Sequence, residues 1–550
     1  MRIGRKTFTY DYLAIALLTL VGSFLRLYNL NWDQGNYFHP DERNIASAVA
    51  RLHFFNQLDP QFFAYGGFSI YLIRVLGELI ARITSNNLWL TDWGHINLIA
   101  RFISAFSATL LIPTVYSLAK EVFDKKTGLT ASFLVVFLPS LIQTAHFGVT
   151  ESLLAFLITM LVAVCISGAN RKLKIAAMAG TIYGIALATK TSAISFFTPI
   201  LLASFTPIKT QKFGQLRFLV TTVFVAFLLL VIFSPYTFLN WNKFYESMNY
   251  ESGVVTGKFK VVYVLQFEKT TPYLFQLKNL FWQMGLTAGL GVMGIIILAL
   301  FALKNKDFKK LIFLSFPITY FAYVGSWYTK FVRYMVPILP FLCLTAAWLL
   351  VVICRKYKFL GKTLITFFLL TTAFWGLAFF SIYTRSQTRI VASQWIYENI
   401  PEGAKILGEH WDDGLPLPLP DNNPSYYSIE QLTIYEPDSS DKIDYYADRL
   451  NTADYIIINS RRLYGTLINL PEKYPITSRY YQFLFSDQLG YKKVAEFSSY
   501  PQLFGLKIDD DKSEETFQVY DHPKVIIFSN QHTKTKKQII SLLSEQKNVD

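Results

Sequence analysis

The sequence predicts a polytopic α-helical membrane protein that ends in a soluble α/β domain. Of its 550 residues, 52% are hydrophobic and only 16% are charged, a balance that soluble globular domains do not have. Apolar runs of about 20 residues, the length that crosses ~30 Å of hydrocarbon, recur up to Tyr383. After Thr384 the apolar runs shorten, and Asp and Pro become frequent. We therefore expect a transmembrane domain over residues 1–383 and a soluble domain over residues 384–550.

The distribution of charge predicts the orientation of the chain. In a soluble protein the net charge of +14 would suggest a nucleic-acid partner, but residues 1–383 carry 34 basic and 14 acidic residues, whereas residues 384–550 carry 18 and 24. Short basic clusters between spans resist translocation and mark the cytoplasmic side. We therefore expect a multi-pass protein of the cytoplasmic (inner) membrane, with its N-terminus inside, its C-terminal domain outside and no nucleic-acid partner.

Apolar stretches and basic clusters together predict about eleven membrane-spanning helices. They cover residues 10–30, 96–118, 127–146, 149–168, 175–189, 192–208, 216–238, 281–303, 311–328, 332–353 and 362–383. Residues 62–83 are also apolar, but Arg74, Glu78 and Arg82 follow one helical face at i, i+4 and i+8. We expect an amphipathic helix there, at the outer interface of a first external loop over residues 31–95. Residues 239–280 form a second external loop.

Cysteine adds no chemistry to this scheme. Cys165, Cys343 and Cys354 lie in or at the edge of apolar stretches, so they supply neither a disulfide framework nor a cysteine-based metal site.

The basic residues before Tyr10 precede an apolar run without a small-residue cleavage site. We expect a retained first span rather than a removed signal peptide.

Acidic residues are scarce in the apolar part, which makes each one informative. Glu151 is the only carboxylate between Asp124 and Glu246, and the predicted topology places it at the external end of a helix. A carboxylate at the rim of the membrane is costly and suggests a functional site. The alternative is a first-turn charge favoured by the helix dipole, with Thr150 as the cap. The sequence alone does not separate the two.

A second pair of acids follows the first predicted span. A proline restricts the entry to a helix whose first turn carries Asp41 and Glu42, beside His39. Because adjacent helical residues point about 100° apart, the two carboxylates cannot share one target. We expect one to face a substrate while the other pairs with an arginine, for which Arg43 and Arg51 are close in the sequence.

Two cations break the charge pattern on the same face. Lys190 lies at the tip of a predicted helical hairpin, and Arg333 begins the run Arg333-Tyr334-Met-Val-Pro-Ile-Leu-Pro340. Snorkelling to the outer headgroups is the alternative, and it fits Lys330 better than Arg333. We expect Lys190 and Arg333 to be counter-charges for a phosphate or diphosphate, for which arginine offers a bidentate fork.

Four short motifs in this order carry a resemblance to a known class. They are Asp41-Glu42 after the first span, Gly148-Val-Thr-Glu151-Ser-Leu-Leu, Ala188-Thr-Lys190-Thr-Ser, and the run that begins at Arg333. The pattern, over residues 10–383, resembles the GT-C class of membrane glycosyltransferases. The most similar branch is the protein O-mannosyltransferase and lipid A aminoarabinose transferase group, especially its prokaryotic members. The resemblance implies the GT-C fold, with about eleven membrane helices.

The resemblance also implies a reaction. A sugar passes from a polyprenyl-phosphate donor to a hydroxyl of a protein, lipid or glycan acceptor, outside the cytoplasmic membrane and with inversion at the anomeric carbon. Carried over, Asp41 looks like the general base, a role worth ~10² to 10⁴ in rate, and Glu42 like its structural neighbour. Lys190 and Arg333 suit the leaving lipid phosphate, which needs charge stabilisation rather than a proton.

The candidate site residues follow from these motifs. The catalytic candidates are Asp41, Glu42 and Glu151, and the substrate-binding candidates are His39, Arg43, His146, Lys190, Arg333 and Tyr334. Glu151 departs from the family, where Asp is more frequent. A divalent metal is the one candidate cofactor, since His39, His146 and Glu151 could form a His/carboxylate site and some relatives use a metal. The alternative makes both histidines hydrogen-bonding partners in an acceptor cleft.

The soluble domain of about 165 residues reads as small α/β or α+β. Helices are expected over residues 389–400 and 538–546, and strands over 404–407, 453–459, 504–508, 517–520 and 525–528. The runs Glu409–Asp413 and Tyr520–Pro523 carry reactive side chains, but strand-end turns rich in Asp and Pro are commoner than active sites. We expect this domain to cover the cleft or to engage the acceptor.

A lipid or polysaccharide transporter, or an envelope-assembly protein without transferase activity, is the alternative function. Transporters place charges near the bilayer midplane, in discontinuous helices with repeat symmetry. Here the notable charges share one predicted face and no internal repeat is evident. This distribution favours the transferase.

Overall fold

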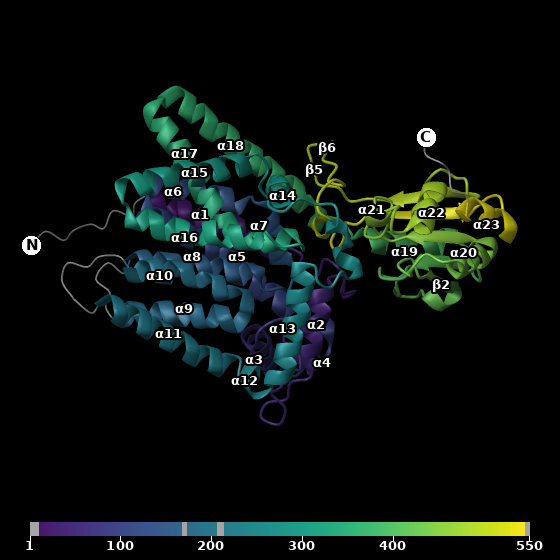
Figure 1. The fold of residues 1–550 in the computed structure, drawn as a ribbon, viewed down its shortest axis with the longest axis horizontal. Coiled ribbons are helices and arrows are strands. Elements are labelled where there is room, and N and C mark those ends of the chain that lie inside the picture. The colour runs from purple at the N-terminus through teal and green to yellow at the C-terminus, as the bar shows by residue number, and fades with distance from the viewer. Residues whose placement is uncertain (1–9, 168–172, 206–213, 545–550) are drawn as a thin grey trace, which may run out of the picture. The chain divides into compact units, whose positions relative to one another are not determined.

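The computed structural model describes residues 10–167, 173–205 and 214–544, and the chain divides into two compact units (Figure 1). Unit 1 comprises Met1–Phe259 and Thr271–Phe380. Unit 2 comprises Ser381–Asp550 together with Lys260–Thr270. The predicted second external loop is therefore shared between the units, which the sequence did not indicate.

Unit 1 is a bundle of apolar helices. Within the described residues, six helical segments are long and apolar enough to cross a membrane, and a seventh is added if α6 (Lys125–Val136) and α7 (Pro139–His146), bent by 55°, form one span. The six contain α1 (Tyr10–Leu27), α5 (Trp93–Val122), α11 (Gly214–Phe233), α15 (Thr287–Asn305), η3 with α17 (Val332–Ile338 and Leu339–Lys356) and α18 (Lys358–Phe380). The polytopic helical fold class is confirmed.

Shorter helices account for the difference from the predicted number of spans. The apolar ones are α8 (Glu151–Ser167), α9 (Leu173–Thr189) and η1 with α10 (Thr191–Phe196 and Phe197–Phe205), and α16 (Phe308–Val324) covers the predicted span 311–328. The ends of two predicted spans, residue 168 and residues 206–208, lie outside the described part of the chain. The eleven apolar stretches thus coincide with helices, but only six or seven described segments meet the length and hydropathy required of a span.

The remaining helices of unit 1 gather at one end of the long helices (Figure 1). They are α2 (Pro40–Ala50), α3 (Gly67–Thr84), α4 (Leu88–Thr91), α12 (Tyr236–Leu239), α13 (Trp241–Thr256) and α14 (Leu274–Met284). All six come from the two segments predicted as external loops or their edge. These loops are therefore largely helical and cover the bundle end where the candidate site lies.

Helix α3 is amphipathic, as its sequence predicts. Val75, Leu79 and Ile83 are exposed at i, i+4 and i+8 and form an apolar stripe. On the inner side Arg74 is buried and binds Glu78 at 2.8 Å. An exposed apolar stripe beside a paired charge is the pattern of a helix that lies on a lipid surface.

Unit 2 is built on a five-stranded mixed sheet of order β2-β1-β3-β7-β4. Strand β1 (Lys405–Glu409) is parallel to β2 (Ser428–Leu432) and to the central β3 (Tyr455–Ile458), while β7 (Val525–Asn530) is antiparallel to β3 and β4 (Tyr491–Phe497). Its helices are α19 (Thr388–Asn399), α20 (Ser440–Thr452), α21 (Tyr464–Leu467), α22 (Pro475–Phe485) and α23 (Lys536–Ser544). Leu407, Ile456 and Phe528 bring one face of the sheet into the core with Tyr446 and Tyr480.

Most predicted elements of this unit are confirmed. Residues 404–407, 453–459 and 525–528 contribute to β1, β3 and β7, and residues 504–508 lie in the hairpin of β5 (Gln502–Leu503) and β6 (Leu506–Lys507). The predicted strand over residues 517–520 is wrong: it follows η6 (Glu515–Phe517) into a turn. Its apolar side chains are buried through that turn rather than through strand pairing.

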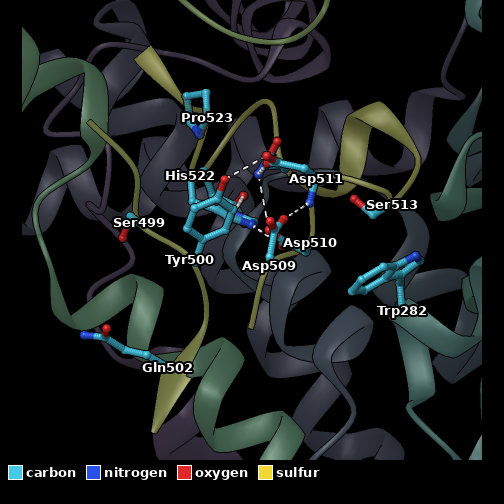
Figure 2. A network of polar contacts seen from close by, with 12 residues as sticks. Trp282, Ser499, Tyr500, Gln502, Asp509, Asp510, Asp511, Ser513, His522 and Pro523 are labelled. Carbon is cyan, nitrogen blue, oxygen red and sulfur yellow. Dashed lines mark hydrogen bonds and ion pairs between the residues drawn. The ribbon is translucent and has the colours of Figure 1, made fainter. Parts of the chain in front are cut away.

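Both reactive-looking runs of unit 2 are held in polar networks. Figure 2 shows His522 beside the loop of Asp509 to Asp511; its Nε2 lies 2.7 Å from Asp510, and its Nδ1 lies 2.5 Å from Asp521. The Tyr383 hydroxyl donates to Asp521 at 2.7 Å. All three of His522, Asp510 and Asp521 are buried.

In the other run, Arg389 donates to Asp412 at 3.0 Å and Tyr481 donates to Glu409 at 2.5 Å. These buried side chains bind one another. Both runs therefore have contacts that stabilise unit 2 itself.

Candidate active site

Asp41 lies at the start of α2, where the chain is capped by its neighbours. The ring Nδ1 of His39 accepts a hydrogen bond from the Asp41 backbone N–H at 3.2 Å, and Pro40 occupies the first helical position. Burial lowers the pKa of His39, so the ring is neutral near pH 7 and Nδ1 can accept this bond. His39 thus positions the start of α2. This role does not involve a substrate, whereas the sequence predicted His39 as a substrate-binding residue.

Two donors bind the Asp41 carboxylate. The Tyr65 hydroxyl donates to Oδ2 at 2.8 Å, and Arg333 Nη2 lies 3.3 Å from the same oxygen. Burial alone would raise the pKa of Asp41, but Arg333, His39 and the Tyr65 hydrogen bond outweigh it and lower that pKa to about 2. Asp41 is therefore ionised at neutral pH, with 18% of its side chain exposed.

Glu151 and Lys190 form a second ion pair beside the first. Lys190 Nζ lies 2.8 Å from Glu151 Oε1, and the two side chains come from α8 and the hairpin tip after α9. Glu151 is 3% exposed, and its Oε2 has no hydrogen-bond partner among the described residues. The Thr150 hydroxyl also lacks a partner there, so it does not cap α8 in the way the alternative interpretation requires.

Tyr65 joins the two pairs. Its hydroxyl binds Asp41, and Lys190 Nζ lies 4.8 Å from the centre of its ring, within cation–π range. The next residue, Gly66, donates its backbone N–H to Thr189 O at 2.9 Å. A Cβ at Gly66 would lie 2.1 Å from Ala188 O, so only glycine permits this approach to the hairpin tip.

Arg333 is held by aromatic rings as well as by Asp41. Its guanidinium carbon lies 4.6 Å from the Phe331 ring centre and 5.8 Å from that of Tyr334. The Tyr320 hydroxyl donates to Tyr334 O at 2.8 Å and fixes the backbone of η3. The structure therefore brings Asp41, Glu151, Lys190 and Arg333 together as alternating negative and positive charges.

Glu42 points away from these four charges and is bound within a buried cluster of polar side chains. Both of its oxygens bind Arg101, at 2.8 and 2.6 Å, and Oε1 also accepts the Gly148 N–H at 2.5 Å. Arg101 binds Asp33 through two further bonds of 2.9 and 2.6 Å. Glu42 pairs with an arginine, as expected, but that arginine is Arg101 rather than Arg43 or Arg51. Asp41 also lies beside an arginine, Arg333, and its contact with a substrate stays a prediction.

The remaining predicted residues lie elsewhere. Arg43 donates from Nε to Tyr37 O at 2.5 Å, on the flank of α2. Both ring nitrogens of His146 contact backbone carbonyls, Nδ1 at Ile142 O (2.8 Å) and Nε2 at Tyr28 O (2.9 Å). His146 therefore braces α7 against α1, and its ring presents no nitrogen to a metal.

Within the described residues, no three His, Cys, Asp or Glu side chains are arranged as a metal site. Asp41 and Glu151 each face a cationic side chain instead. The predicted ligand set of His39, His146 and Glu151 does not fit a metal, because both histidines use ring nitrogens in backbone contacts.

Tyr65, Arg101 and Asp33 were not predicted as site residues. Arg101 lies inside an apolar stretch, where a cation is costly and suggests a partner, so that signal was present. Asp33 lies in a polar segment and Tyr65 lies among other aromatic residues, so neither side chain is distinctive in its surroundings.

Comparisons with known proteins address the fold and the class of enzyme. Residues 90–239 match the family model described as dolichyl-phosphate-mannose-protein mannosyltransferase, a range that includes Glu151 and Lys190. No curated protein matches the chain. The apo oligosaccharyltransferase of Archaeoglobus fulgidus has a similar structure, with a TM-score of 0.51, 14% identity, and coverage of 92% of this chain and 76% of that one. The structural likeness shows the GT-C fold, and the family match supports a glycosyltransferase.

Two further structures resemble this GT-C glycosyltransferase. The A. fulgidus enzyme tethered to an acceptor peptide with an NVT sequon gives a TM-score of 0.50 at 14% identity, over 95% of this chain and 89% of that one. ArnT of Cupriavidus metallidurans bound to undecaprenyl phosphate gives 0.46 at 14% identity, over 98% and 100%.

Proposed function

We propose that this GT-C glycosyltransferase transfers a sugar from a polyprenyl-phosphate donor to the hydroxyl of a protein, lipid or glycan acceptor. The reaction takes place on the extracytoplasmic face of a prokaryotic cytoplasmic membrane and inverts the anomeric carbon. The observation that carries the proposal is a group of four alternating charges at one end of a bundle of apolar helices. In order, they are Arg333, Asp41, Lys190 and Glu151. The family match, named for a dolichyl-phosphate sugar, supports the choice of donor.

In this proposal Lys190 and Arg333 bind the donor phosphate. A lipid phosphate leaves without a proton, so its departure is promoted by fixed positive charge. Arginine also offers two parallel N–H donors to the phosphate oxygens. The side chain of Arg333 is 18% exposed and that of Lys190 19%, so both can be reached from outside the protein.

Asp41 is the general base for the acceptor. Its pKa of about 2 makes it a weak base while Arg333 is paired with it. When Arg333 turns to the phosphate, the carboxylate loses its nearest cation and its pKa rises. The acceptor proton then passes to Asp41, the acceptor oxygen bonds to the anomeric carbon, and the C–O bond to phosphate breaks with its electron pair on the phosphate. Attack opposite the leaving group inverts the configuration.

Donor cleavage by the purified protein tests this function. The full chain in lipid nanodiscs is offered undecaprenyl-phosphate and dolichyl-phosphate sugars, one at a time, with a pool of hydroxyl acceptors. We expect free polyprenyl phosphate and a glycosylated acceptor of opposite anomeric configuration for at least one donor. Movement of intact lipid-linked sugar across a proteoliposome membrane, without cleavage of any donor, would favour the transporter instead.

A further inference from the structure

A third carboxylate, Glu251 of α13, lies between the elements that carry the two cations. Met248 Sδ accepts from the Thr191 hydroxyl at 3.4 Å, next to Lys190 in the chain. About two turns further on, Thr329 donates to Val254 O and Val255 O at 2.8 and 3.2 Å. Helix α13 is thus fixed at two points, one beside Lys190 and one on the irregular segment that leads to Arg333.

The helical period then places Glu251 on the same side. Residues 248, 251 and 255 are spaced i, i+3 and i+7, so they share one face of α13. Glu251 is half-buried, and its carboxylate has no hydrogen bond or ion pair with any of the described residues. Its carboxylate therefore faces the ion pairs without belonging to either.

The electrostatics agree with this placement. Burial raises the pKa of Glu251, the Asp41 charge raises it further, and Lys190 and Arg333 lower it. These groups belong to α2, the hairpin tip and η3, and all three are close enough for their charges to act on Glu251. The net direction is upward, so repulsion and burial outweigh the two cations.

Glu251 changes the net charge around the proposed phosphate site. Asp41 and Glu151 cancel Lys190 and Arg333, so ionised Glu251 leaves this group of five side chains one charge negative. A donor phosphodiester carries one negative charge, whereas the product, a lipid phosphate monoester, carries about −1.5 to −2 at neutral pH. Repulsion scales with the product of the charges, so it acts about twice as strongly on the product.

We propose that Glu251 is a specificity-determining residue that favours the singly charged donor phosphate over the doubly charged lipid phosphate product, and so promotes product release. The inference rests on the proposed function, because it assigns the phosphate to Lys190 and Arg333. It adds a residue on a different element, with a role in discrimination rather than in bond cleavage. Glu251 acts through space and touches no reacting atom.

Two matched probes test the inference without knowledge of the sugar. Hexadecyl methyl phosphate is a diester with one charge, and hexadecyl phosphate is a monoester with two charges at about pH 8.5, above its second pKa of ~6. Binding of each to the full chain in phosphatidylcholine nanodiscs is measured for the wild type, Glu251→Gln and Glu246→Gln. Glu246 is an exposed glutamate on the same helix and is the matched control.

We expect Glu251→Gln to bind the diester about three- to tenfold more tightly, as removal of one nearby like charge predicts. The gain for the monoester should be roughly the square of that factor, and Glu246→Gln should stay within about twofold of the wild type. A gain in affinity cannot result from misfolding. Equal factors for both probes, or no change, would overturn the inference while leaving the phosphate site intact.

The same data separate failure of the inference from failure of the proposed function. Arg333→Gln should weaken both probes by about tenfold or more, because it removes the bidentate donor. If the wild type binds neither probe, or Arg333→Gln binds both normally, the phosphate is not at Lys190 and Arg333. That result contradicts the proposed function and, with it, the role of Glu251.

Discussion

At the scale of single residues, two adjacent acids have separate tasks. Glu42 is 0% exposed and bonded to Arg101 and Gly148, whereas Asp41 is 18% exposed and faces Tyr65 and Arg333. The 100° step between neighbouring helical residues produces this separation. A buried, fully bonded carboxylate supports the fold, and a partly exposed one can meet a substrate.

His522 gives a prediction at the same scale. Burial would lower the pKa of His522, but Asp521 and Asp510 outweigh it and raise that pKa to about 10. Because the folded value exceeds the unfolded ~6.5, the stabilisation is fully present below about pH 6.5 and is lost as the pH rises through about 10. We expect unit 2 to resist protease in the full chain at pH 6 and to become sensitive near pH 10.

His522→Gln is the comparison for that measurement. Without the imidazolium, the two buried aspartates repel each other, so the variant should be less resistant at pH 6, by about 3–5 kcal/mol for a broken buried ion pair. Its resistance should also change less between pH 6 and 10 than that of the wild type. Equal pH dependence in both proteins would mean that His522 is not the titrating group.

The sequence predicted the membrane-face residues better than their partners. Asp41, Glu151, Lys190 and Arg333 were recognisable because charge is scarce in apolar segments. The same scarcity applied to Arg101, but nothing in the sequence linked it to Asp33 and Glu42, which are 68 and 59 residues away. Pairing over such separations depends on how helices pack, which a single sequence does not encode locally.

At the scale of elements, the site depends on a close contact between a loop and a hairpin tip. Gly66 and Thr189 share a backbone hydrogen bond, and this contact places Tyr65 beside Lys190. The sequence predicted an external loop and a hairpin here, but not that they touch. The strands β2 and β4 were missed because both are largely exposed and lack a clear apolar alternation.

Gly66→Ala tests the importance of this contact. The new Cβ would lie 2.1 Å from Ala188 O, so the loop must shift and Tyr65 must move away from Lys190. We expect sugar transfer to fall about tenfold or more, since small misplacements at an active site cost up to ~10²-fold. The melting temperature in detergent should also fall by several degrees.

Gly289→Ala is the matched control. Gly289 lies in α15, and a Cβ there would meet no atom within 4 Å. Alanine also favours a helix over glycine by up to ~1 kcal/mol, so this variant should keep full activity and at least wild-type stability. Wild-type activity of Gly66→Ala would show that the loop contact does not position the site.

At the scale of the whole molecule, the apolar bundle and the charged end have separate roles. Helices long enough to span a membrane occupy unit 1. The helices from the two segments that were predicted as external loops gather at one end of them (Figure 1). An uneven distribution of this kind suits the proposed reaction of a lipid-borne donor at one surface of a membrane. A polytopic membrane protein was predictable from composition and charge alone, because the membrane directly constrains the length of apolar runs and the distribution of basic residues.

The central claim is that Asp41 accepts the proton of the acceptor hydroxyl, and one comparison tests it most directly. The rate of sugar transfer from a cleaved polyprenyl-phosphate donor is measured for the wild type, Asp41→Asn and Glu246→Gln, with donor binding measured in parallel. We predict that Asp41→Asn loses about 10²- to 10⁴-fold in kcat and still binds the donor, while Glu246→Gln is unaffected. Transfer by Asp41→Asn at the wild-type rate would contradict the account.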